Sequence, residues 1–165
     1  MATFSLEEKI LKINKKNFKY IQKGEGQLVL LIHGWPENCN SWLSQISFIS
    51  KLGYKAVAIN VRGYADSFSP HSIQSYKLKF FMEDIIDIIN YFNKKNAILI
   101  GHDWGAPICW TTAAYYKEKI TAVIGLSVPF TRRGKISSTK LWQKLYKNIF
   151  FYQNYFQYEN IPEKE

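Results

Sequence analysis

A single carboxylate stands at a tight corner in the stretch ILIGHDWGAPICW, residues 98–110. The apolar run before Asp103 suits a buried strand, and the segment after it suits a helix. Gly101 and Gly105 flank Asp103 at two positions on either side, and small residues there let a strand turn sharply into a helix. Such an elbow projects its corner side chain into a site, beside helix N–H groups that favour an anion. The pattern therefore predicts that Asp103 is a nucleophile.

A second interpretation of Asp103 is equally compatible with this stretch taken alone. Aspartate just before a helix most often serves as an N-cap, whose side-chain oxygen accepts a hydrogen bond from the first turn. An N-cap needs no cavity and implies no chemistry.

A second motif favours the nucleophile. His33-Gly34-Trp35-Pro36-Glu37 ends the apolar run LVLLIH and lies in the kind of loop that donates a backbone N–H to an oxyanion hole. The N–H of Trp35, together with that of Trp104 directly after the nucleophile, would aim two donors at one developing oxyanion. An ordinary turn at the end of a strand is the alternative for this motif alone.

Predicted strands and helices alternate as far as residue 129. Strands are predicted in NFKYIQKGEG, QLVLLIHG, KAVAINV, NAILIG and ITAVIGLSV. Helices are predicted after the GWPEN loop, over about residues 77–93 and over APICWTTAAYYKE. In the helix over 77–93, apolar residues such as Ile85 share one face, and Glu83, Asp84 and Asp87 fall mainly on the opposite, polar face.

This order predicts an α/β fold in which a mostly parallel sheet is covered by helices on both faces. The loops HGWPEN, VRGYADS and GHDWG each follow a predicted strand directly. Because ligands bind beyond the carboxyl ends of the strands in such sheets, we expect all three loops to meet at one rim.

Composition narrows the functional classes. The 165 residues suit one globular domain, and the net charge of +9 comes mostly from scattered lysines without a nucleic-acid-binding motif. The two cysteines lack disulfide or metal spacing, and the histidines His33, His71 and His102 with Asp66 form no ligand pattern. No secretory signal and no apolar run of membrane-spanning length is present. We therefore expect a cytoplasmic protein without a metal, cofactor, nucleic-acid partner or membrane span.

Five motifs, HGWPE, RGYADS, GHDWGAPICW, GLSVPF and FYQNYFQ, follow one another in the order and approximate spacing of the α/β-hydrolase-fold epoxide hydrolases. The chain resembles this family from about residue 18 to its end. Asp instead of Ser at the elbow separates the group from esterases and lipases. The resemblance implies an α/β-hydrolase core over residues 1–129 and the beginning of a helical cap over residues 130–165.

The resemblance also implies a mechanism and a set of site residues. Asp103 would attack an epoxide carbon and form an ester, while Tyr152 of the cap motif protonates the leaving alkoxide. Water would then hydrolyse the ester to a diol, with the N–H groups of Trp35 and Trp104 stabilising the oxyanion. The implied substrate-pocket residues are His33, Pro36, Gln153 and Phe156. A plain aromatic core patch is the alternative for the cap motif.

One part of the family's machinery has no match in this sequence. The family's base is a histidine paired with an acid, both located after the cap, and no histidine follows His102 here. We expect the N-terminal portion of an epoxide hydrolase, incomplete or inactive as this chain, with a separately encoded C-terminal half as one explanation.

Two other functions stay open from the sequence. A haloalkane dehalogenase shares the elbow aspartate, although that group more often carries Asn where this chain has Trp35. A non-catalytic remnant or binding domain could retain the pocket and rest its basic segment 132–147 on an acidic partner or a membrane surface.

Overall fold

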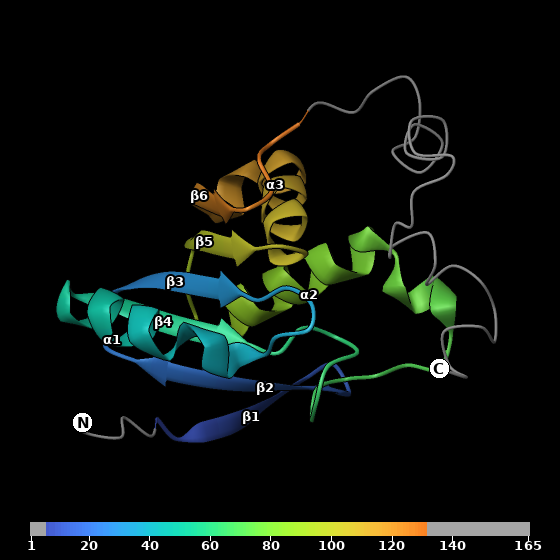
Figure 1. Ribbon diagram of the computed structural model, residues 1–165, viewed down its shortest axis with the longest axis horizontal. Helices are drawn as coiled ribbons and strands as arrows, with labels where there is room; N and C mark the ends of the chain where they lie inside the picture. The colour runs from blue at the N-terminus through green and yellow to red at the C-terminus, as the bar shows by residue number, and fades with distance from the viewer. Residues whose placement is uncertain (1–5, 132–165) are drawn as a thin grey trace, which may run out of the picture. The chain divides into compact units, whose positions relative to one another are not determined.

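The computed structural model describes residues 6–131, within which six strands form one sheet (Figure 1). The strands are β1 (Glu8–Ile13), β2 (Lys16–Lys23), β3 (Gln27–Ile32), β4 (Tyr54–Ile59), β5 (Ala97–His102) and β6 (Ile120–Leu126). Their order across the sheet is β1-β2-β4-β3-β5-β6. β4, β3, β5 and β6 are parallel neighbours, whereas β2 runs antiparallel to both β1 and β4. The predicted α/β fold with a mostly parallel sheet is confirmed.

Helices connect the parallel strands. The α-helices are α1 (Leu43–Lys51), α2 (Leu78–Tyr91) and α3 (Gly105–Tyr115), and the short 3-10 helices are η1 (Cys39–Trp42), η2 (Ile73–Tyr76) and η3 (Lys117–Lys119). α2 falls inside the predicted range. β1 is not predicted from the sequence, because Leu11 is its one buried residue and the alternation that marks a half-buried strand is therefore weak.

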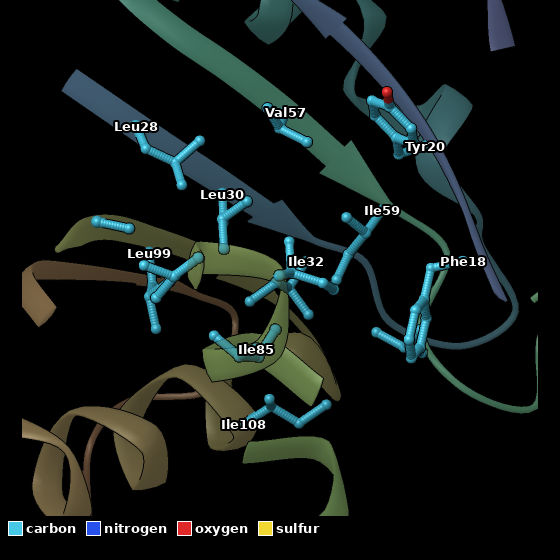
Figure 2. Close-up of a cluster of buried hydrophobic side chains, with 14 of the residues drawn as sticks. Phe18, Tyr20, Leu28, Leu30, Ile32, Val57, Ile59, Ile85, Leu99 and Ile108 are labelled. Atoms are coloured by element: carbon cyan, nitrogen blue, oxygen red, sulfur yellow. The ribbon is translucent and has the colours of Figure 1, made fainter. Parts of the chain in front are cut away.

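The central strands are buried on both faces, and alternate side chains of β3 enter different cores. Leu28, Leu30 and Ile32 belong to the cluster that packs against α2 and α3, part of which Figure 2 shows. Val29 and Leu31 belong to the cluster on the other face, with residues of η1 and α1. Helices therefore cover both faces of the sheet, as the continuous apolar run of β3 predicts.

The chain divides into two units, Met1–Phe130 and Thr131–Glu165. The predicted cap over residues 130–165 lies almost entirely outside the described residues. Within residues 6–131, every helix is too short or too polar to cross a membrane.

The expectation that Asp84 lies on the polar face of α2 is wrong, because its side chain is buried against Arg62. Arg62 Nε donates to Asp84 Oδ2 over 2.6 Å and Arg62 Nη2 to Oδ1 over 2.8 Å, and Lys16 Nζ lies 2.7 Å from Oδ1. Arg62 also donates to the carbonyls of Ser75 and Phe80. This buried pair therefore ties the loop after β4 to η2 and to the first turn of α2.

Replacing Arg62 with alanine tests this tie. We expect R62A to lower the free energy of unfolding by about 3 kcal/mol, because it leaves the buried Asp84 carboxylate without its bidentate partner. Urea unfolding measures the loss. The control is E83Q, an exposed charge on the same helix, which should change stability by less than about 0.5 kcal/mol. Equal effects of the two substitutions would contradict the assignment.

Candidate active site

The turn from β5 into α3 has the geometry of a nucleophile elbow. Asp103 has φ 49°, in the left-handed region that a non-glycine residue rarely adopts. A Cβ on Gly101 would collide with the carbonyl oxygen of Gly105, and a Cβ on Gly105 would collide with that of Ile32. The two flanking glycines are therefore required because the backbones of the elbow and of β3 approach closely.

The Asp103 carboxylate is directed to the neighbouring loop rather than to its own helix. Its Oδ1 accepts a hydrogen bond of 2.9 Å from the N–H of Trp35, and the residue is half-buried. The N-cap of α3 is Trp104, which makes no side-chain capping bond, and the Ala106 N–H bonds to the main-chain oxygen of Asp103. Among the described residues, the Asp103 side chain thus caps no helix.

Gly34 brings the loop after β3 into contact with the elbow. A Cβ at Gly34 would overlap the Cβ, Cγ and Oδ1 atoms of Asp103. Gly34 is therefore required for steric reasons, because a larger residue would separate the Trp35 N–H from the carboxylate. The Trp35-Pro36 peptide bond that follows is cis.

His33 is fully buried, and both of its ring nitrogens are engaged. Nε2 accepts the N–H of Val61 over 3.2 Å, so the ring proton lies on Nδ1, which donates to the Gly34 carbonyl over 2.8 Å. Burial lowers the pKa of His33, against the smaller opposing effect of the Gly34 hydrogen bond. His33 is therefore a neutral, fixed imidazole at neutral pH and is not available to activate a water molecule.

A cavity of about 290 Å³ lies beside the elbow. Its wall includes His33 and Trp104 together with residues that sequence reasoning missed, namely Tyr64, Tyr76, Leu78, Phe81, Pro107 and Ile108. Burial, and secondarily the charge of Asp103, raises the pKa of Tyr64. The described residues that line the cavity are mostly apolar, and Asp103 stands next to this wall in the chain rather than in it.

The other predicted pocket residues are not brought to this cavity by the described part of the chain. Pro36 is exposed and is absent from the described residues that line the cavity. Tyr152, Gln153 and Phe156 lie outside the described residues. The motif RGYADS was the sequence signal for Tyr64. Tyr76 ends η2 and Leu78 begins α2, and only the fold shows that both line the cavity.

The remaining histidines differ from His33 in their surroundings. His102 Nδ1 lies 3.1 Å from Glu37 Oε2, and both side chains are half-exposed. His71 is exposed. Within residues 6–131, His, Cys, Asp and Glu side chains form no group of three or more that could hold a metal ion.

Comparison with known proteins places this geometry in a class. A family model described as the alpha/beta hydrolase fold matches residues 27–164, and the chain belongs to that family. Epoxide hydrolase B of Mycobacterium tuberculosis is 39% identical over 112 residues, which cover 68% of this chain and 32% of that protein. Bifunctional epoxide hydrolase 2 of Sus scrofa is 33% identical over 147 residues, which cover 88% of this chain and 26% of that protein.

Solved structures show the same relationship. The crystal structure of epoxide hydrolase A from Mycobacterium thermoresistibile superposes with a TM-score of 0.90 at 33% identity, covering 95% of this chain and 50% of that one. The similarity to epoxide hydrolases that the motifs indicate is confirmed. The chain spans between about a quarter and a half of the length of these relatives.

The state of His33 predicts how stability depends on pH. The unfolded chain binds a proton at His33 near its ordinary pKa of 6.5, whereas the buried ring binds it only at lower pH. The contribution of His33 is therefore fully present above pH 6.5 and is lost as the pH falls toward the folded pKa. Unfolding midpoints measured from about pH 7.5 to about pH 5.5 should fall more steeply for the wild type than for H33N. Equal slopes would contradict a buried, neutral His33.

Substituting Gly34 tests the contact with Asp103. We expect G34A to lower the free energy of unfolding by about 1–3 kcal/mol, because its methyl group overlaps a packed carboxylate. The amide signal of Trp35 in a ¹⁵N–¹H spectrum should move. The control is G53A, whose methyl group meets nothing within 4 Å. Its φ of +82° makes G53A strain the backbone, so the control introduces strain without a contact to Asp103. A Trp35 signal that responds equally to both substitutions would contradict the contact.

Proposed function

We propose that this chain carries the nucleophilic half of an epoxide hydrolase and that Asp103 forms an ester with the substrate. The observation that carries the proposal is the Asp103 carboxylate, which accepts the Trp35 N–H and caps no helix among the described residues. An apolar cavity beside the elbow supports it, because a small uncharged epoxide matches such a wall.

The first step needs a carboxylate and an acid. An Asp103 oxygen attacks one epoxide carbon, the bond from that carbon to the ring oxygen breaks, and the electron pair stays on the ring oxygen. The resulting alkoxide takes a proton from a phenol, for which Tyr152 is the match to the family's cap motif. The product of this step is a hydroxyalkyl ester of Asp103.

The second step needs a base. A base takes a proton from water as the water oxygen adds to the ester carbonyl, and the N–H groups of Trp35 and Trp104 receive the oxyanion. On collapse the departing alkoxide takes the proton from the base, which releases the diol, and the carboxylic acid left on Asp103 returns its proton to the phenolate of the first step. Both ring nitrogens of His33 are engaged, and no histidine follows His102 in the sequence. We therefore propose that this chain forms the ester and stalls there, because His33 cannot act as the base.

Intact-protein mass spectrometry after exposure to styrene oxide tests the proposal. We expect a stable mass increase equal to one epoxide molecule, located on Asp103 by peptide mapping and absent from D103A and from the matched variant D103N. A folded wild-type protein that forms no adduct would exclude Asp103 as the nucleophile.

Two further assays separate the alternatives. Turnover of styrene oxide to the diol by the chain alone would show that a base exists within it and would refute the stalled ester. Release of bromide from a bromoalkane without reaction at the epoxide would favour the haloalkane dehalogenase instead.

A further inference from the structure

We infer that His33 is a positioning residue that aims the Trp35 N–H at Asp103 by holding the Gly34 carbonyl. The inference gives a role in the proposed reaction to a side chain that sequence reasoning assigns only to the pocket wall. Its relevance to catalysis rests on the proposed function, but the hydrogen-bonded arrangement itself can be tested without any substrate.

The Gly34 carbonyl and the Trp35 N–H belong to one peptide group. This peptide bond is trans, so its C=O and N–H point in opposite directions within one plane. The carbonyl accepts from His33 Nδ1 over 2.8 Å and from the Glu37 N–H over 3.0 Å. The N–H on the other side donates to Asp103 Oδ1 over 2.9 Å. Fixing the carbonyl therefore fixes the direction of the donor.

The imidazole is itself held in one orientation and one tautomer. The Val61 N–H, just beyond the end of β4, donates to Nε2 over 3.2 Å, and this bond requires the ring proton on Nδ1. The ring of Tyr64 packs edge-on at 4.7 Å between centroids. Through its two hydrogen bonds, His33 thus links the loop after β4 at Val61 to the loop after β3 at Gly34.

The same arrangement strengthens the donor. A peptide whose carbonyl accepts hydrogen bonds becomes more polarised, and its N–H becomes a better donor. Burial lowers the pKa of His33, so the ring stays neutral at neutral pH and adds no cation beside Asp103. The carboxylate therefore receives an oriented dipole rather than a full ion pair from this direction.

A buried histidine that only fills space would show no preference between its two nitrogens, and two matched variants separate them. In H33N, the side-chain amide nitrogen can occupy the place of Nδ1 and keep the donor to Gly34, but it loses the acceptor for Val61. In H33Q, the side-chain oxygen can reach the place of Nε2 and keep that acceptor, but the donor to Gly34 is lost.

The experiment records ¹⁵N–¹H spectra and amide hydrogen exchange of the full 165-residue chain at neutral pH. We expect H33Q to move the Trp35 amide signal toward that of a weaker hydrogen bond and to accelerate its exchange about tenfold. H33N should keep both values close to the wild type. Equal changes in the two variants, or no change in either, would overturn the inference.

A measurement on the unmodified protein keeps the inference testable even where a variant does not fold. The ¹⁵N signals of the His33 ring should show a proton on Nδ1 and none on Nε2. The opposite tautomer would refute the inference, because Nδ1 could then no longer donate to Gly34.

The proposed function is tested apart from this arrangement by the rate of adduct formation with styrene oxide. H33Q should slow the hydrolysis of a preformed ester by added hydroxide more than H33N does, if Trp35 serves the oxyanion. A wild-type protein with the expected Trp35 and His33 signals but no adduct would refute the proposed function and leave the positioning role intact.

Discussion

The contact between Gly34 and the Asp103 carboxylate is the constraint on which the site depends. β3 and β5 are parallel neighbours, and their register pairs Ile32 with Gly101, so both strands end at the same level. The loops that follow must then pass each other with almost no space between them. Glycines resolve the crossing on both sides, because a Cβ on Gly34 would meet Asp103 and a Cβ on Gly105 would meet the Ile32 carbonyl. The absence of these side chains lets the Trp35 N–H reach the Asp103 carboxylate.

Much of this arrangement could be predicted from the sequence because its causes are local. The small residues around Asp103 indicate a sharp turn, and the apolar run of β3 indicates a strand that is buried on both faces. Asp84 could not be placed correctly, because its burial depends on Arg62, which lies across a loop of unpredictable course. The walls of the cavity were missed for the same reason, since Tyr76 reaches it only through the fold of that loop.

Two aspartates of this chain show how the surroundings decide the use of a carboxylate. Asp84 is buried between Arg62 and Lys16, and such direct ion pairs occupy its oxygens and fix the position of neighbouring segments. Asp103 receives one backbone N–H and no ion pair from the described residues. An oriented dipole stabilises the anion less than a guanidinium does, and it leaves the second oxygen available to bond carbon. The first environment suits structure and the second suits nucleophilic attack.

The two steps of the proposed reaction, epoxide opening and ester hydrolysis, need different chemical groups. Opening an epoxide needs an anionic oxygen, a neighbouring acid and a cavity. This step does not require any group to accept a proton from water. Hydrolysing the ester needs a base with a free nitrogen or oxygen close to the ester carbonyl. His33, which borders the cavity beside the elbow, is excluded from that role by the same two hydrogen bonds that suit it to orient Trp35. A ring held by both of its nitrogens cannot also turn toward water, so the proposed reaction needs a group other than His33 as its base.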